Sequence, residues 1–167
     1  MKVLVGTKYL PMEIQNYMRN KVSFRPHIPH QYHVSTLVGC LKQYFYGIVN
    51  PYRCSFSLED CFNLSRGILF DKVFTPLFSL HQKTYTLTMD GATITGTLDF
   101  VAFDGELGER VLYDLKAPKS TFYLKNGDAR PHYERQVLCY LALAKQNRDL
   151  EDVHRCRVLF ITGDVVI

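Results

Sequence analysis

The stretch VLYDLKA at residues 111–117, preceded by GTLDFV at residues 96–101, decides the fold that this sequence predicts. Both stretches are rich in apolar and β-branched residues, which predicts two buried strands. Because side chains alternate along a strand, Asp114 and Lys116 project from one face. If the two strands form a hairpin, Asp99 lies close to Asp114.

Further strands and helices are predicted on both sides of this pair. Strands are expected at residues 84–88, 92–103, 110–117 and 156–162, and helices near 11–19, at 35–47, at 64–80 as far as Pro76, and at 131–146. Ser35 is the expected N-cap of the second helix, Gly47 is its expected stop, and residues 54–63 are expected to form a loop. Asp90-Gly91 predicts a tight turn between the first two strands.

This order of elements predicts an α/β (α+β) fold. An antiparallel meander, a crossover helix and a further strand give a mixed central sheet flanked by helices. The 167 residues suit one domain, which we divide into an N-terminal helical and loop region at 1–63 and a core at 64–167. The hydrophobic share of 47% and the charged share of 22% exclude a disordered chain.

Several features bear on the compartment. No apolar run is long enough to span a bilayer, and the first residues do not form a signal peptide, so we expect a cytoplasmic protein without a membrane partner. The five cysteines include no CxxC pair, which argues against a disulfide framework and favours a reducing compartment.

The net charge of +4 is unevenly distributed. Residues 1–58 carry seven Lys or Arg and one acid, and residues 116–148 carry seven bases and two acids, whereas residues 59–115 carry nine acids and four bases. Basic stretches around an acidic middle suit a protein that holds a phosphate backbone with cations and a metal with carboxylates. The alternative is ordinary solvated helix faces. The candidate phosphate contacts in the second basic stretch are Lys119, Lys125, Arg130 and Arg135.

The chemistry of the central trio points to a metal site. A carboxylate and an ammonium on one face of a buried strand are unfavourable unless they are paired or bind an ion. The oxygens of Asp99 and Asp114 together form a hard site for Mg²⁺ or Mn²⁺, and Lys116 would help to neutralise a phosphate there. The alternative is a structural Asp–Lys pair without catalysis, and the residue types alone do not separate the two.

The motifs GTLDF, YDLK and the later QVLCY at residues 136–140 together resemble the RecB-like branch of the PD-(D/E)xK nucleases. They are most similar to the small CRISPR-associated exonucleases of that branch. That family has G-x-x-D, then (D/E)-x-K, then Q-x-x-x-Y on a strand, a strand and a helix, which is the order here. The resemblance covers roughly residues 35–162 and implies a restriction-endonuclease-like core.

The resemblance implies a role for each matching residue. Asp99 and Asp114 would hold the metal together with the carbonyl of Leu115, and Lys116 would be the catalytic lysine. Gln136 and Tyr140 lie four residues apart on one helix face and would border the site. Without the family, Gln136 would be an exposed polar residue of the helix and Tyr140 a core aromatic.

Two departures from the family concern metals. The sequence RGILFD at residues 66–71 resembles a helix in which a His follows the Gly by four residues, but Asp71 stands in that place. An acid also suits a hard metal, so Asp71 is a candidate ligand. The small exonucleases often carry a [4Fe–4S] cluster on four cysteines. Here Cys40 matches the first of them and only Cys156 is late in the chain, so we expect no iron–sulfur cluster.

The function expected from these observations is a Mg²⁺- or Mn²⁺-dependent deoxyribonuclease, an exonuclease on single-stranded or frayed DNA. One alternative is a structure-specific endonuclease of the same fold. Another is a catalytically weak DNA-binding or partner subunit of a repair or CRISPR-adaptation complex. Besides DNA, the expected partners are further copies of the same chain or partner proteins of those pathways.

Overall fold

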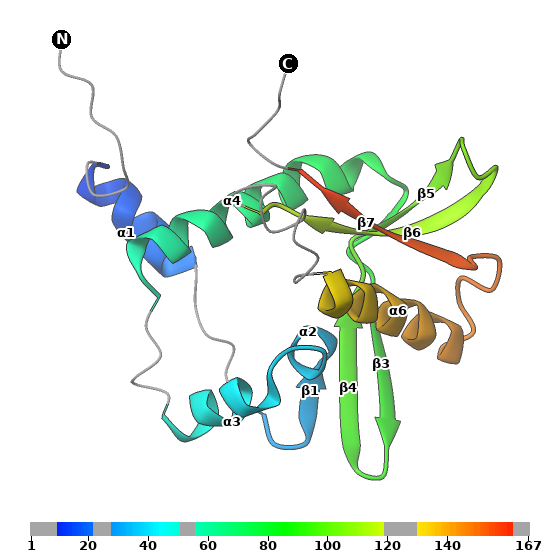
Figure 1. Ribbon diagram of the computed structural model, residues 1–167, viewed down its shortest axis with the longest axis horizontal. Coiled ribbons are helices and arrows are strands. Elements are labelled where there is room, and N and C mark those ends of the chain that lie inside the picture. The colour runs from blue at the N-terminus through cyan, green and yellow to red at the C-terminus, as the bar shows by residue number, and fades with distance from the viewer. Residues whose placement is uncertain (1–9, 22–27, 51–55, 119–129, 162–167) are drawn as a thin grey trace.

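The computed structural model describes residues 10–21, 28–50, 56–118 and 130–161 (Figure 1). The helices are α1 Met12–Lys21, α2 Val34–Leu37, α3 Leu41–Val49, α4 Leu58–Phe74, the 3-10 turn η3 Thr75–Leu77, and α6 Arg130–Gln146. The strands are β1 Gln31–His33, β2 Leu80–His81, β3 Thr84–Met89, β4 Ala92–Thr97, β5 Phe100–Asp104, β6 Glu109–Lys116 and β7 Arg155–Phe160. The α/β class is confirmed, and so are the helices expected near residues 11–19 and at 131–146.

The described strands form two mixed sheets in place of one central sheet. The smaller sheet has the order β1-β4-β3, with β1 parallel and β3 antiparallel to β4. The larger sheet has the order β2-β5-β6-β7, in which β5 and β6 are antiparallel and β6 and β7 are parallel. The expected turn between β3 and β4 is present, because Asp90 and Gly91 both have positive φ, at 48° and 77°. The connection from β6 to β7 is the expected crossover through α6.

The single strand expected at residues 92–103 is wrong, because the chain changes sheets near Asp99. β4 ends at Thr97 in the smaller sheet, and β5 starts at Phe100 in the larger one. This bend between the sheets lies at Leu98 and Asp99, and just before it, within β4, an added Cβ at Gly96 would lie 2.8 Å from Cδ1 of Tyr140 on α6. Only a residue without a side chain allows this close approach. The alternating sequence pattern does not record the bend.

The core lies between α6 and both sheets. From α6, Val137, Tyr140 and Ala144 are buried with Leu98 and Leu112 of the sheet region in one apolar cluster. In Figure 1, α6 runs beside β7 and the β3–β4 hairpin, which agrees with this cluster. Burial of such side chains is the main stabilising contribution, at roughly 1.5–3 kcal/mol for each large one.

The opposite face of the larger sheet has an aromatic stack. Phe100 lies between Phe78 and Tyr113, with ring centroids 4.0 Å and 5.1 Å apart and nearly parallel planes. Because Phe100 pairs with Tyr113, the residues on either side of Tyr113 in β6, Leu112 and Asp114, must face α6. The register therefore assigns Asp114 to the α6 side.

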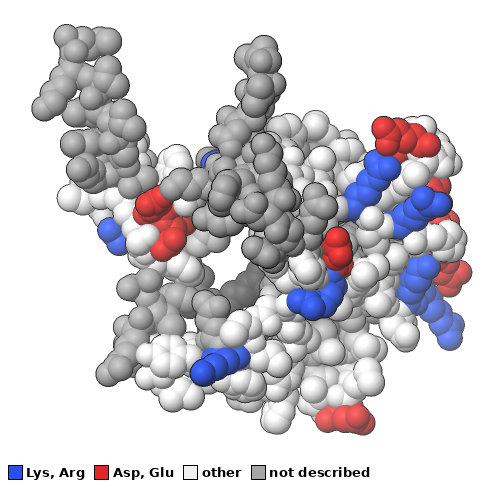
Figure 2. Space-filling model, in the orientation of Figure 1, with Lys and Arg blue, Asp and Glu red and all other residues white. Residues whose placement is uncertain are grey.

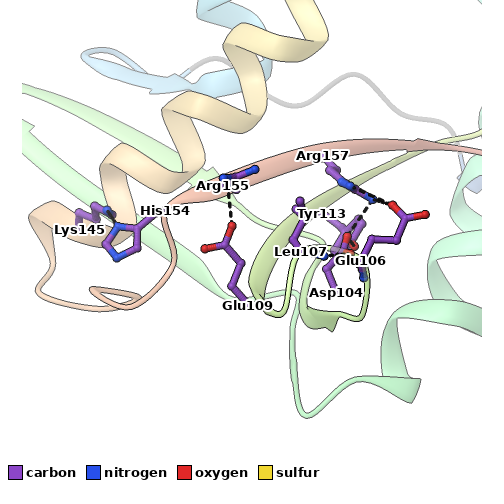
Figure 3. Close-up of polar contacts among 9 residues, drawn as sticks. All are labelled: Asp104, Glu106, Leu107, Glu109, Tyr113, Lys145, His154, Arg155 and Arg157. Atoms are coloured by element: carbon purple, nitrogen blue, oxygen red, sulfur yellow. Dashed lines mark hydrogen bonds and ion pairs between the residues drawn. The ribbon is translucent and has the colours of Figure 1, made fainter.

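The turn between β5 and β6 is held by a charged cluster, drawn in Figure 3. Asp104 is buried, accepts a hydrogen bond from the Tyr113 hydroxyl at 2.6 Å, and lies 2.8 Å from Nη1 of Arg157 on β7. Glu106 pairs with the same guanidinium at 3.3 Å. In the space-filling view of Figure 2, Lys and Arg lie side by side with Asp and Glu over this end of the sheet. Arg157 is therefore paired with acids of the same chain.

Two expectations for the N-terminal half are wrong. The helix at residues 35–47 is two helices, α2 and α3, and Ser35 lies inside α2 while Gly47 lies inside α3. The loop expected at 54–63 is helical from Leu58, so the boundary drawn at residue 63 falls within α4. Ser57 caps α4, since its hydroxyl accepts the N–H of Asp60 at 3.1 Å and the Asp60 carboxylate accepts the N–H of Ser57.

α4 begins at Leu58, before residue 64 where this helix was expected to start. It ends at Phe74, because Pro76 cannot continue an α-helix, and the 3-10 turn η3 follows it. α1 packs against α4, as Figure 1 shows. None of the described helices is long and apolar enough to cross a membrane.

Candidate active site

Asp99 and Asp114 face each other across β5 and β6. The last residue pair of these strands is Phe100 with Tyr113, so continuing the register by one residue places Asp99 opposite Asp114. The strand pairing ends at Phe100. Beyond it, Oδ2 of Asp99 accepts the backbone N–H of Leu115 at 2.6 Å, where a backbone carbonyl of a longer strand would otherwise accept it. The expected proximity of the two acids is confirmed, and it depends on the chain bend at residue 99.

Lys116 pairs with Asp114, as expected for side chains on one face of a strand. Nζ of Lys116 lies 2.7 Å from Oδ2 of Asp114. The Asp114 side chain is 1% exposed and that of Lys116 is 19% exposed, so this is a buried ion pair whose ammonium still reaches the surface. Such a pair is itself weak evidence of stabilisation, because desolvation opposes the Coulomb attraction.

The electrostatics of the site are those of crowded, desolvated carboxyls. Burial raises the pKa of Asp114 to about 6; the Lys116 ammonium opposes this, and repulsion from Asp99 and Asp71 adds to it. Burial also raises the pKa of Asp99, while the Leu115 N–H and Lys116 work against the rise. Asp71 of α4 has its pKa raised to about 6 by burial and by Asp99. Perturbed acids of this kind are enriched in functional sites.

The donor set fits a hard divalent cation. Asp99 and Asp114 supply carboxylate oxygens, and a cation between them would offset the burial that raises both pKa values and the repulsion from Asp99 that adds to the rise at Asp114. The carbonyl of Lys116 faces β7, since it accepts the N–H of Ile161 at 2.8 Å. The carbonyl of Leu115, one residue earlier, therefore faces the Asp99 side, which suits its expected role as a ligand.

Asp71 interacts electrostatically with Asp99 and Lys116, but it does not form a metal-ligand cluster with the other acids. Within the described ranges, no group of three or more His, Cys, Asp or Glu is arranged to hold a metal. Asp71 belongs to α4, whose bounds differ from those expected, and its backbone carbonyl accepts a hydrogen bond from the Thr75 hydroxyl at 2.6 Å. Its role as a ligand stays a prediction.

The side chains of Gln136 and Tyr140 on α6 form a hydrogen bond with each other. The Gln136 amide donates to the Tyr140 hydroxyl at 2.6 Å, and both side chains are buried. Gln136 is therefore not the exposed polar residue of the simpler alternative, while Tyr140 does belong to the core cluster. Their shared position on one helix face is confirmed.

Three residues at the site were missed by sequence reasoning. The ring of Tyr133 on α6 lies 5.5 Å from Nζ of Lys116, within the range of a cation–π contact. The Gln82 amide lies 3.4 Å from Oδ1 of Asp99, and Arg66 donates to the carbonyl of Ala117 at 2.8 Å. Arg66 belongs to the RGILFD motif at residues 66–71. Gln82 and Tyr133 belong to no sequence motif, and only the folded chain shows that they lie at the site.

His132 is close to the same ammonium. Its ring centroid lies 3.9 Å from that of Tyr133, and burial, Lys116 and Arg135 together lower its pKa. Among the expected phosphate contacts, Arg135 is exposed on α6. Lys119, Lys125 and the side chain of Arg130 lie outside the described residues.

Cysteine positions bear on the iron–sulfur expectation. Cys40 is exposed just before α3, and Cys156 is a half-buried residue of β7 whose thiol lies 3.9 Å from the carbonyl of Val137. Burial raises the pKa of Cys156 to about 11, which disfavours the thiolate that a metal requires. Cys54 lies outside the described residues.

Comparisons with known proteins give the fold only. No family model matches the chain, and no curated protein matches it. Among solved structures, the chain is similar to the crystal structure of SSO0001, with a TM-score of 0.59 and 15% sequence identity over 91% of this chain and 72% of that chain. This likeness supports the mixed α/β architecture.

Proposed function

We propose that this protein is a Mg²⁺- or Mn²⁺-dependent deoxyribonuclease with a PD-(D/E)xK core. The observation that carries the proposal is the opposed pair of half-buried Asp99 and buried Asp114, with Lys116 ion-paired to Asp114. A structural salt bridge needs one acid for one base, whereas here two desolvated acids repel each other around a single ammonium. The second acid is explained if the site takes a cation.

Each residue of the site has a separate role in the proposed reaction. Asp99 and Asp114 would hold the cation, with the Leu115 carbonyl as a further oxygen donor. The Lys116 ammonium, partly exposed and held over the Tyr133 ring, would contact the scissile phosphate and help to neutralise it. Asp71, whose pKa is raised to about 6 by burial and by Asp99, would accept or release a proton in the reaction. The cation would supply further neutralisation of the phosphate and lower the pKa of water.

The proposed form of the activity is exonucleolytic, on single-stranded or frayed DNA, and rests on the motif resemblance. A reducing cytoplasm is the proposed compartment. A structure-specific endonuclease of the same fold would use the same residues. A catalytically weak partner subunit would bind DNA without cleaving it.

Cleavage of end-labelled DNA tests the proposal. Purified protein is incubated with 5′- or 3′-labelled single-stranded and frayed DNA, and separately with unlabelled closed circular DNA, in Mg²⁺, Mn²⁺ or EDTA. The proposal expects cleavage with metal and none in EDTA. Loss of circular DNA would indicate endonucleolytic cleavage, and the label pattern gives the polarity. Metal-independent cleavage, or none with either metal by a folded protein that binds DNA, would contradict it.

A further inference from the structure

A groove between α6 and β7 opens beside the lysine of the site. It has a volume of about 560 Å³, and its walls include Tyr133 and Val137 from α6 and Val158 and Phe160 from β7. This volume lies in the range of sites that hold small planar ligands. Tyr133 belongs both to the groove and to the contact with Lys116.

The strand register places the groove next to the acids. In the parallel ladder Asp114 pairs with Val158, and Lys116 pairs with Phe160. Paired residues of neighbouring strands face the same side of a sheet and are about 5 Å apart. Moving across the α6 side of the sheet, the order is therefore Asp99, then Asp114 and Lys116, then the apolar groove.

The chemistry of the lining excludes a phosphate as the occupant. Among the described residues that line the groove, none is Lys or Arg, and the single charged residue is the exposed Glu134. An apolar wall with one carboxylate disfavours an anion but accepts a planar ring that donates hydrogen bonds. Nucleobases have both properties, since they carry amino donors at their edges and broad faces for stacking.

The aromatic residues of the groove are arranged for stacking. Tyr133 and Phe160 meet edge to face, with ring centroids 5.7 Å apart and planes at 68°, and both are half-buried. Tyr133 also contacts Lys116 and His132, so the half-buried ring of Phe160 offers the surface for a further aromatic partner. Offset and edge-to-face contacts with a third ring would extend this pair.

We propose that the groove between α6 and β7 binds one unpaired base of the DNA strand whose phosphate lies at Asp114 and Lys116. This inference rests on the proposed function and adds to it a specific base-binding subsite. A base in a duplex is stacked and paired and does not enter such a groove, so the subsite favours single-stranded or frayed ends.

The test combines removal of one base with removal of one ring. Affinity is measured by fluorescence anisotropy in Ca²⁺ for short single-stranded oligonucleotides that each lack one base at a different position. The wild type should lose between about fivefold and about a hundredfold in affinity at one position, the range known for base–aromatic stacking. Phe160→Leu should bind intact DNA more weakly by a similar factor and be insensitive to the abasic site at that position.

Two further variants keep the test decisive. Leu159→Ala changes the neighbouring exposed residue on the other face of β7 and should keep the wild-type profile. Val158→Phe fills the groove without removing a ring. It should also bind intact DNA more weakly and be insensitive to the abasic site, so it replaces Phe160→Leu in the test if that variant folds poorly. Thermal melts confirm folding of each variant.

The outcomes separate the inference from the proposed function. If the wild type cleaves DNA but both groove variants keep its abasic profile, the base subsite is refuted and the nuclease stands. The same conclusion follows if the variants abolish self-association instead, which would indicate that an apolar protein segment occupies the groove. If the folded wild type neither binds nor cleaves DNA, both ideas fail.

Discussion

Replacing Asp114 by asparagine should stabilise the metal-free protein at neutral and alkaline pH. The Asp114 side chain is 1% exposed, and burial, with repulsion from Asp99 and Asp71 and despite Lys116, raises its pKa from 3.8 to about 6. At a pH below 3.8 both the folded and the unfolded chain bind the proton, so this group has no effect on stability. As the pH rises through 6, the folded protein must bury a charge that the unfolded chain exposes to water.

The size of the effect follows from the two pKa values. The difference between 3.8 and about 6 corresponds to roughly 3 kcal/mol of stability lost between those pH values. For a chain of this length, about 1 kcal/mol shifts the melting temperature by roughly 2–4 °C. Asp114→Asn should therefore melt roughly 6–12 °C above the wild type at pH 8 in EDTA, with Lys116 still facing Asp99.

The assay is urea and thermal unfolding in EDTA between pH 4 and pH 8, with Asp152→Asn as a control for an exposed acid. The gain for Asp114→Asn should shrink progressively as the pH falls. Saturating Mn²⁺ should stabilise the wild type and not the variant. A variant that is less stable than the wild type at pH 8, or an offset that does not change with pH, would refute the reasoning.

Three further predictions concern single contacts. Tyr133→Leu should lower kcat about threefold to tenfold with little change in KM, while Tyr133→Phe keeps the ring beside Lys116 and should stay near wild type in single-turnover cleavage. Gly96→Ala should lower stability by about 1–3 kcal/mol, because its methyl group collides with the Tyr140 ring; an unchanged urea midpoint would contradict the close packing. Ser57→Ala should cost about 1 kcal/mol by removing the cap of α4, and Ser57→Asp should restore it; equal melting temperatures for all three proteins would disprove the role of the cap.

The sequence allowed the centre of the site to be predicted because local rules determine it. Alternation along β6 places Asp114 and Lys116 on one face, and a short connection makes the hairpin that brings Asp99 opposite. The long amphipathic helix at residues 131–146 is equally local, since its periodicity and length are visible in the sequence.

The errors arose where tertiary packing overrides the local pattern. The close approach of Tyr140 to Gly96, 44 residues away in the chain, and the change of sheet between β4 and β5 are tertiary features that the alternating pattern does not show. The contact between Lys116 and Tyr133 depends on how α6 lies across the sheet, which residue types do not reveal. The start of α4 was different, because Ser57 and Asp60 form a capping box that is legible in the sequence.

The most direct test of the site is the single-turnover rate of DNA cleavage by Asp114→Asn in Mg²⁺, beside the wild type and Asp152→Asn. Each variant differs from the wild type by one amide for one carboxylate, and the control acid is exposed and pairs with Arg110, at the other end of β6 from Lys116. The account predicts that Asp114→Asn loses at least about a hundredfold in rate while folding more stably without metal, and that Asp152→Asn keeps the wild-type rate. Full activity in Asp114→Asn would show that these carboxylates are not the catalytic centre.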